Sequence, residues 1–329
     1  MSETASESNN RGTGILPVLP VLPERPESPA RVVPEEPPLQ AGLTGPAVRF
    51  MDRRPGVYSW LRVKKKFPHM WCPGCGLGAI LGAFTRALIH QNYSKDEVVV
   101  VSGIGCTGRI PVYLDCNTLH TTHGRALTFA TGIKLVKPHL KVIVFMGDGD
   151  ALAIGGNHFI HACRRNLGVS AIVVNNSIYG MTGGQVSPTT PSGKRGTTAP
   201  LGNIEQPFDT CALAIGAGAS FVARATVYHY NLMEKLMCQA MSHEGFSVLE
   251  IVSNCQTFFG RLNKSGSHID MLKQMRDRAA TYSPTLDVAK ARSEGKDLVV
   301  GVLKQDDGRK EYCALYEEEV VRPSMAGKG

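Results

Sequence analysis

Two short motifs combine residue types that can hold a metal ion next to a phosphate group. Gly147-Asp148-Gly149 follows an apolar run at 141–146, and Asn175-Asn176 follows a second apolar run at 170–174. Runs of this length bounded by Gly indicate buried parallel strands, and the helical interval between them completes a βαβ unit. Asp148 and Asn176 are then expected just past the carboxyl ends of two strands, where doubly wound sheets bind ligands. A carboxylate, an amide oxygen and a backbone carbonyl suit Mg²⁺ beside diphosphate oxygens.

This arrangement resembles the thiamine diphosphate signature, in which Gly-Asp-Gly is followed by a pair of asparagines. The alternative is a generic strand, turn and helix in which Asp148 only caps the helix predicted at about 151–166. The second, correctly spaced Asn pair favours the diphosphate site. Thr182 and Gln185 follow the Asn pair closely, so cofactor contacts are expected there, with loop packing as the alternative. The predicted cofactor-binding residues include Gly147, Asp148, Gly149, Asp150, Asn175, Asn176, Thr182 and Gln185.

Four cysteines are candidates for an iron–sulfur cluster. Cys72 and Cys75 form a CxxC pair, while Cys106 and Cys255 each follow the carboxyl end of a predicted strand. Their sulfurs are therefore expected to gather at the edge of the sheet that holds the diphosphate site, which suits a [4Fe–4S] cluster. Tetrahedral zinc fits the same ligand set, although a zinc site usually has a second CxxC. Cys211, at the start of a predicted helix, is the alternative fourth ligand.

Composition limits the classes of function. The chain has 329 residues with ordinary apolar content, and its net charge of +8 favours an acidic partner such as an electron carrier. Its basic runs are too sparse to predict nucleic-acid binding. Nine cysteines without a secretory signal indicate reduced thiols and a cytoplasmic protein. The absence of a long apolar run predicts no membrane span.

The elements that must position these motifs alternate between strands and helices across 71–255, which predicts an α/β fold with a doubly wound, mostly parallel sheet. Proline recurs at every third position from Pro17 to Pro29, and residues 1–48 are expected to be a disordered leader. Met51 is an alternative natural start. The catalytic domain is predicted at 49–264. Residues 265–329 are expected to be a small appendage with a helix at 268–280 and a hairpin-like turn at Asp306-Asp307-Gly308.

The expected secondary structure is specific enough to compare with a structure. Strands are predicted at 96–101, 141–146, 170–174, 220–223 and 246–252, and a long loop at 183–203. Helices are predicted up to residue 90, up to residue 136, and at 151–166, 208–216 and 230–242.

From about Lys66 to Gly260 the chain resembles the β subunit of 2-oxoacid:ferredoxin oxidoreductases, especially the 2-oxoglutarate branch. The motifs that carry the resemblance are CPGCG, GIGCTGRIP, HTTHGRA, GDGDALAIGGNHFIHACRRN, VVNNSIYGMTGGQVSPTTP and EIVSNCQTF. The resemblance implies thiamine diphosphate, Mg²⁺ held by Asp148, Asn176 and the carbonyl of Ile178, and one [4Fe–4S] cluster. It also implies that Cys72, Cys75, Cys106 and Cys255 match the cluster cysteines.

The activity implied by the resemblance is oxidative decarboxylation of 2-oxoglutarate to succinyl-CoA, with electrons passing through the cluster to ferredoxin, reversible in principle. An α subunit would complete the site in an α2β2 heterotetramer, and coenzyme A would be the acyl acceptor. His123 is predicted to contact diphosphate or substrate, with a structural role as the alternative. Arg109 is predicted to face the substrate carboxylates, with a surface ion pair as the alternative.

The sequence is also compatible with three other functions. The substrate of the same enzyme class could be pyruvate or a branched 2-oxoacid. A non-oxidative thiamine enzyme would share the diphosphate motif without needing the cysteines. A zinc-knuckle interaction scaffold on a degenerate fold would bind zinc and would not depend on thiamine.

Overall fold

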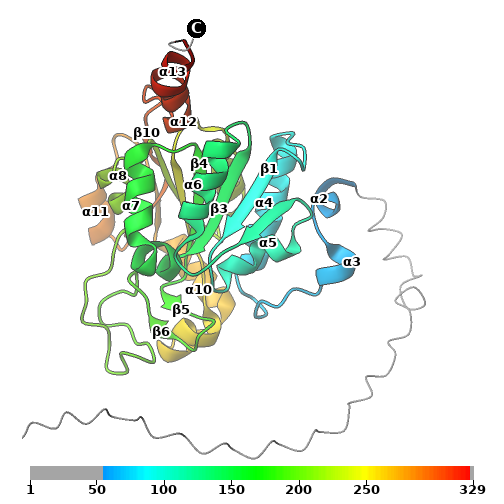
Figure 1. The fold of residues 1–329 in the computed structure, drawn as a ribbon. Helices are drawn as coiled ribbons and strands as arrows, with labels where there is room; N and C mark the ends of the chain where they lie inside the picture. The colour runs from blue at the N-terminus through cyan, green and yellow to red at the C-terminus, as the bar shows by residue number, and fades with distance from the viewer. Residues whose placement is uncertain (1–54, 327–329) are drawn as a thin grey trace, which may run out of the picture. The chain divides into compact units, whose positions relative to one another are not determined.

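The computed structural model describes residues 55–326 and is built on one large sheet (Figure 1). Its eight strands lie in the order β2-β1-β3-β4-β8-β7-β10-β9. In chain order these are β1 (Val98–Ser102), β2 (Asn117–His120), β3 (Lys141–Gly147), β4 (Val169–Asn175), β7 (Phe221–Thr226), β8 (Ser247–Val252), β9 (Ala279–Thr281) and β10 (Leu298–Gln305). A separate pair joins β5 (Ile178–Tyr179) to β6 (Gln185–Val186) in antiparallel register.

Helices precede or follow most strands. The longer ones are α4 (Leu77–His90), α6 (Ala126–Val136), α7 (Gly156–Arg165), α8 (Thr210–Gly216), α9 (Tyr230–Ser242) and α10 (His268–Asp277). The short ones are α2 (Pro55–Ser59), α3 (Val63–Lys66), η1 (Thr107–Arg109), α5 (Ile110–Tyr113), η2 (Asp150–Ile154), η3 (Gln256–Gly260), α11 (Val288–Ser293), α12 (Tyr312–Tyr316), η4 (Glu317–Val321) and α13 (Arg322–Ala326).

Six neighbouring strands, from β2 to β7, run parallel, which confirms the predicted mostly parallel sheet. Their central members are almost wholly apolar because both faces are covered by helices. Alternate side chains enter opposite cores. Val98 and Val100 pack on the side of α4 and α9, whereas Val99 and Val101 pack on the side of α6, α7 and α8. The fold is therefore a sheet between two helical layers.

Parallel register places the carboxyl ends of β1, β3, β4 and β8 at one edge of the sheet. Within the order, β2 lies on one side of β1 and β3 on the other, so the chain reverses its direction of winding between β1 and β3. A reversal of this kind opens a crevice beyond the strand ends. The segments that follow these four strands contain Cys106, Asp148, Asn176 and Cys255.

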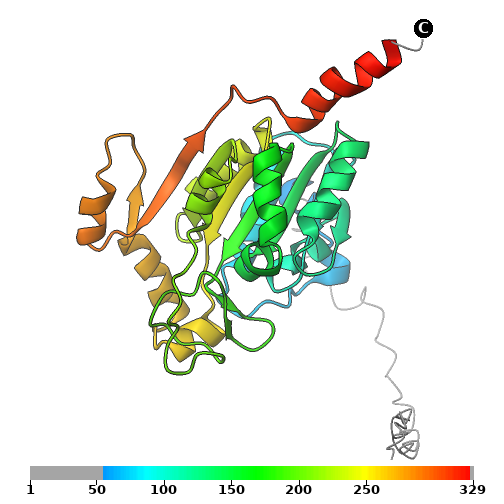
Figure 2. The ribbon, with the colours of Figure 1, turned by 60° about the vertical axis from the view of Figure 1, so that its left-hand side comes forward.

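The predicted hairpin after β10 is wrong. The strand β10 instead runs antiparallel beside β7 in the main sheet, with β9 outside it (Figure 2). Residues after the Asp306-Asp307-Gly308 turn form helix α12, capped by the Glu311 carboxylate, which accepts a bond from the Ala314 amide at 2.9 Å. The other Glu311 oxygen accepts from the Gly168 amide at 2.7 Å. These tertiary contacts favour a helix where the local turn residues indicated a hairpin.

Other differences lie at the edges. The edge strand β2 was not predicted, because its half-exposed sequence NTLH lacks an apolar pattern. Helix α10 ends at Asp277, before the predicted residue 280, since Ala279–Thr281 pairs with β10. The predicted leader at 1–48 and the start at Met51 lie outside the described residues. Among the helices of residues 55–326, none combines the length and apolar character needed to cross a bilayer.

Because β10 is part of the main sheet, we expect its buried side chains to contribute to the free energy of unfolding. Leu298 on β10 is only 8% exposed, whereas Leu315 on α12 is 41% exposed. Leu298→Ala should lower the free energy of unfolding by about 2–5 kcal/mol, because it leaves a cavity beside the sheet. Leu315→Ala is the matched control and should change it by less than about 0.5 kcal/mol. Denaturant unfolding followed by circular dichroism measures both. Equal effects would mean that β10 contributes no more to stability than the surface of α12.

Candidate functional site

Asp148 is a buried carboxylate at the end of β3. It is 3% exposed, and its Oδ2 accepts hydrogen bonds from Ser187 Oγ at 2.6 Å and Thr189 Oγ1 at 2.5 Å. Burial raises the pKa of Asp148 although these two hydroxyl bonds act in the opposite direction. A nearby cation would offset the cost of burying the negative charge. The site is therefore suited to a divalent metal ion.

The two asparagines that follow β4 shape a tight turn. Asn175 Oδ1 accepts from the Ser177 amide at 3.1 Å, and Ser177 has φ of 60°, a left-handed conformation that is unfavourable for serine. Asn176 Oδ1 accepts from the Ile178 amide at 3.3 Å. These bonds stabilise a strained backbone at the position where the predicted metal ligands Asn176 and Ile178 lie.

The glycines of the Gly147-Asp148-Gly149 motif leave room for a close approach. A Cβ atom at Gly149 would overlap the ring of Tyr179, whose hydroxyl donates to the Gly149 carbonyl at 3.3 Å. Tyr179 thus packs directly on the turn after β3 and links it to the segment after β4.

Asp150 lies at the start of η2, and its carboxylate points to the chain after β2. Its Oδ1 accepts from the Gly124 amide at 2.6 Å and lies 2.7 Å from His123 Nδ1. The His123 ring is 6.2 Å from the Tyr179 ring, centroid to centroid, so it lies close to the turn that follows β3. Burial raises the pKa of Asp150, against the Gly124 and His123 contacts. The structure therefore joins His123 and Asp150 into one pair.

The four predicted cluster cysteines line a single pocket, together with Asn176 and Gly180. A Cβ atom at Gly180 would lie 3.5 Å from Cys255 Sγ and 3.8 Å from Cys106 Sγ. The indole of Trp71 closes one side and donates to the Cys106 carbonyl at 2.8 Å. The pocket therefore joins the thiols to one of the predicted metal ligands.

Burial disfavours the charged form of two of these thiols, those of Cys75 and Cys106. It raises the pKa of Cys75 to about 11, with the neighbouring sulfurs adding to the effect, and it raises the pKa of Cys106. Thiolates grouped in this way need a positive centre, which a bound metal or cluster would supply by displacing the thiol protons. The donor set fits a Cys₄ cluster as predicted.

Cys211, the alternative fourth ligand, is not in that pocket. It lies on α8, and its buried thiol faces the sheet, where it donates to Glu250 Oε2 at 3.5 Å. The structure therefore brings Cys255, and not Cys211, to the other three cysteines.

For Arg109, Thr182 and Gln185 the contacts do not by themselves indicate a substrate or cofactor. Arg109 is half-buried on η1, and within residues 55–326 no carboxylate lies in ion-pair range of its guanidinium. Its predicted contact with substrate stays a prediction. Thr182 Oγ1 donates to Gln185 Oε1 at 2.6 Å on an exposed segment, which agrees with the loop-packing alternative as well as with a cofactor contact.

Sequence reasoning missed five residues that complete the site, four with a hydroxyl or an aromatic ring and one glycine. These are Trp71, Tyr179, Gly180, Ser187 and Thr189. The run VSPTTP in the predicted long loop held the available signal, because clustered hydroxyls in a loop often bind backbone or carboxylate groups. Glu250 was also missed, although a lone acid in the buried strand SVLEIV requires partners.

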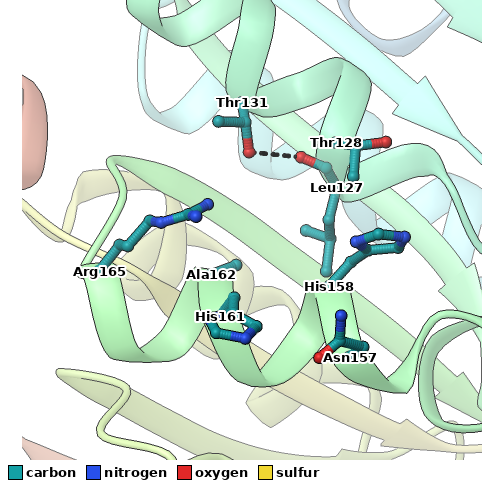
Figure 3. Close-up of a pocket in the computed structure, with 8 residues that line it drawn as sticks. All are labelled: Leu127, Thr128, Thr131, Asn157, His158, His161, Ala162 and Arg165. Carbon is teal, nitrogen blue, oxygen red and sulfur yellow. Dashed lines mark hydrogen bonds between the residues drawn. The ribbon is translucent and has the colours of Figure 1, made fainter.

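A second pocket lies between α6 and α7, on the other face of the sheet from α4 and α9 (Figure 3). It contains none of the predicted site residues. Its lining residues are Leu127, Thr128, Thr131, Asn157, His158, His161, Ala162 and Arg165. The hydrogen bond drawn there joins the Thr131 hydroxyl to the Leu127 carbonyl within one helix. It therefore does not link the side chains of α6 to those of α7.

Comparison with known proteins shows which cofactor-binding class this domain belongs to. Residues 103–251 match the family model described as the C-terminal thiamine pyrophosphate-binding domain of thiamine pyrophosphate enzymes. That range runs from the crevice after β1 to β8 and includes the Asp148 and Asn176 segments. The chain is thus of the thiamine diphosphate-binding α/β class.

Individual relatives show which family of thiamine diphosphate enzymes the chain is most similar to. The chain is 62% identical over 190 residues to the 2-oxoglutarate synthase subunit KorB of Archaeoglobus fulgidus, covering 58% of this chain and 71% of that protein. It is 43% identical over 275 residues to that of Methanothermobacter thermautotrophicus, covering 83% and 96%. A solved 2-oxoglutarate:ferredoxin oxidoreductase from Magnetococcus marinus aligns with a TM-score of 0.72 at 31% identity, covering 82% of this chain and 90% of that chain.

The chain therefore belongs to the β subunits of the 2-oxoacid:ferredoxin oxidoreductases, and within that family it resembles the 2-oxoglutarate synthase subunits. It is a subunit of a thiamine diphosphate-dependent oxidoreductase, and membership among the β subunits implies an α partner.

The His123–Asp150 pair depends on a glycine in the crevice. A Cβ atom at Gly103 would overlap both carboxylate oxygens of Asp150, whereas one at Gly132, within α6, would meet nothing within 4 Å. Gly103→Ala should therefore lower the free energy of unfolding by about 1–3 kcal/mol. Gly132→Ala is the control and should raise it by about 0.5–1 kcal/mol through helix propensity. Thermal unfolding measures both, and a stable Gly103→Ala protein would contradict the close packing of Asp150.

Proposed function

We propose that this chain is the β subunit of a 2-oxoglutarate:ferredoxin oxidoreductase that converts 2-oxoglutarate to succinyl-CoA and passes the electrons through one [4Fe–4S] cluster. The observation that carries the proposal is the pocket that Cys72, Cys75, Cys106 and Cys255 share with Asn176. Electron transfer requires the two centres to be neighbours, and a pocket lined by both Asn176 and the four cysteines supports such an arrangement. A non-oxidative thiamine enzyme would have no use for it.

The protein's own residues have distinct roles in the proposal. Asp148, Asn176 and the Ile178 carbonyl would hold Mg²⁺, and the metal would anchor the diphosphate. Thiamine diphosphate supplies the electron sink for loss of CO₂ when it is bound. The four cysteines would hold the cluster. Ser187 and Thr189 keep Asp148 Oδ2 fixed, and Tyr179 packs on the turn that would face the cofactor.

The substrate side of the proposal rests on relatives and on charge. The relatives named above are 2-oxoglutarate synthases, and the solved neighbour holds 2-oxoglutarate, coenzyme A and succinyl-CoA. Arg109, three positions after Cys106, would bind a substrate carboxylate, since a guanidinium forks well onto carboxylate oxygens. His123, held by Asp150, would contact the diphosphate or the 2-oxoacid. The reaction would be reversible, and the enzyme would assemble with its α subunit as α2β2.

The acceptor is proposed to be an acidic ferredoxin. The segments that contain the lining residues of the cysteine pocket, taken as 55–95, 102–114, 176–204 and 251–269, contain no Asp or Glu. Cys72 is exposed, and the exposed Arg261 lies beside Phe258, which lines the pocket, so a positive charge borders the pocket there. The basic residues of these segments without a carboxylate partner in the described chain are Lys64, Lys65, Lys66, Arg109, Lys194, Arg195, Arg261 and Lys264.

The test of the function uses the enzyme purified anaerobically with its α subunit. We expect about four irons per β chain, characteristic of a Cys-bound [4Fe–4S] centre. We also expect a reduced-cluster signal in electron paramagnetic resonance after adding 2-oxoglutarate and coenzyme A. Pyruvate in place of 2-oxoglutarate should give much less signal. Zinc without iron would overturn the proposal in favour of a scaffold, and iron with no substrate-dependent signal would overturn the assigned substrate.

A pair of cysteine variants identifies the fourth ligand. Cys255→Ser should lose most of the iron and the signal, because the Cys255 sulfur lines the pocket. Cys211→Ser should keep both, because that thiol bonds to Glu250 elsewhere in the fold. The reverse result would move the cluster to the other side of the sheet and contradict the ligand assignment.

Docking of ferredoxin should depend on salt and on Arg261. Its guanidinium lies 5.8 Å from the centre of the Phe258 ring, which lines the cysteine pocket. Arg261→Glu should raise the KM for ferredoxin about tenfold at low ionic strength, and added NaCl should reduce the difference by screening. Reduction of methyl viologen should be unchanged. The control is Arg292→Glu, an exposed arginine on α11. A KM unaffected by both salt and Arg261→Glu would place the docking surface elsewhere.

A further inference from the structure

A carboxylate is buried in the middle of the sheet, behind the asparagine pair. Glu250 lies on β8, is 2% exposed and stands in register with Val173 of β4 and Arg224 of β7. The side chain shares its face with Val248, so it points to the layer of α6, α7 and α8. An acid in this position is costly unless each oxygen has partners.

Both oxygens of Glu250 are fully engaged, in two different directions. Oε1 accepts from Asn175 Nδ2 at 2.8 Å and from Thr210 Oγ1 at 2.7 Å. Oε2 accepts from Arg224 Nε at 2.5 Å and from Cys211 Sγ at 3.5 Å. One side of the carboxylate therefore faces the cofactor motif, and the other faces an ion pair.

The side facing the motif determines how the Asn175 amide is oriented. Because Nδ2 donates to Glu250, Oδ1 is left to accept from the Ser177 amide, and it lies 3.0 Å from Thr189 Oγ1. The Thr189 hydroxyl has a single proton, which Asn175 Oδ1 and Asp148 Oδ2 share as its two acceptors. Thr189 Oγ1 also lies 2.5 Å from Asp148 Oδ2. An unbroken series of polar contacts thus runs from Glu250 through Asn175 and Thr189 to Asp148.

The other side keeps Glu250 from moving. Arg224 also bonds to Asp209 at 2.6 Å, and Asp209 caps α8 by accepting from the Ala212 amide at 3.0 Å. Asp209, Cys211 and Glu250 could resemble a metal site by residue type. The Arg224 guanidinium already supplies the positive charge within that group, so the cluster is an ion pair network and no metal is required.

We infer that Glu250 is a positioning residue for the diphosphate site, acting through Asn175 and Thr189 on the Asp148 carboxylate. This inference rests on the proposed function, since it concerns the binding of thiamine diphosphate with Mg²⁺. The carboxylate holds the Asn175 amide in one orientation, and the amide oxygen then flanks the Thr189 hydroxyl, whose other acceptor is Asp148, which fixes the position of that hydroxyl. Asp148 Oδ2 is thereby occupied, which restrains the group that would bind the metal.

The test is Glu250→Gln in the enzyme assembled with its α subunit. Gln has the same volume but one acceptor fewer, so an NH₂ group must face either the Asn175 and Thr210 donors or Arg224. We expect the Kd for thiamine diphosphate, measured calorimetrically in MgCl₂, to rise about tenfold to a hundredfold, corresponding to one lost charge-assisted hydrogen bond. We expect kcat at saturating thiamine diphosphate to stay within about twofold, because the effect would be on cofactor binding.

A role in stability alone would give a different pattern. Less folded enzyme would lower kcat without changing the Kd, and that result would overturn the inference. Ser247→Ala on the same strand is the matched control, because its buried hydroxyl bonds only to the Ala240 carbonyl at 2.7 Å. It should leave the Kd unchanged.

Thr189→Val tests the same series of contacts if Glu250→Gln fails to fold. It removes the hydroxyl that joins Asn175 to Asp148 without touching the ion pair, and it should raise the Kd similarly, with Thr189→Ser restoring it. A wild-type Kd in folded Thr189→Val or Glu250→Gln enzyme would overturn the inference. Failure of the wild-type enzyme to bind thiamine diphosphate would instead overturn the proposed function.

Discussion

The parallel register of the central strands is the constraint on which the rest of the site depends. Because β1, β3, β4 and β8 all run in one direction, the four segments that leave them emerge at one edge of the sheet. Parallel strands require crossover helices, and these cover both faces and leave that edge open. The diphosphate motif and two of the cysteines follow these strands, and the CxxC pair is brought to them by the segment before α4.

Burial of polar groups at this edge gives the site its chemical character. Asp148 and the thiols of Cys75 and Cys106 are removed from water, which disfavours their charged forms. Each group therefore favours a positive centre beside it, a metal ion in one case and a cluster in the other. Glu250 is the contrasting case, since its charge is met by Arg224 within the protein. The same sheet thus carries one carboxylate, Asp148, whose burial favours a bound cation, and another, Glu250, that is paired with an arginine.

The pocket and the surface around it fit a division of labour between subunits. This chain holds residues for the diphosphate end of the cofactor and for the cluster, in keeping with a β subunit that needs an α partner. No Asp or Glu is among the residues that line the cysteine pocket, a composition that suits the acidic carrier proposed above. Asn176, a proposed metal ligand, lines the same pocket as the four cysteines proposed to hold the cluster.

By itself, the sequence determined the fold class, the family and the residues of both motifs, because apolar runs, glycine turns and cysteine spacing are local signals. Helix α9 was predicted with its observed bounds, and the strands that precede Asp148 and Asn176 were predicted to within about one residue at each end. Only the tertiary structure decided which cysteine joins Cys72, Cys75 and Cys106, since Cys211 and Cys255 differ in the face of the sheet that they reach. It also decided that β10 pairs with β7, that His123 pairs with Asp150, and that polar contacts run from Glu250 to Asp148. Each of these depends on contacts between residues far apart in the chain, and no local pattern encodes such contacts.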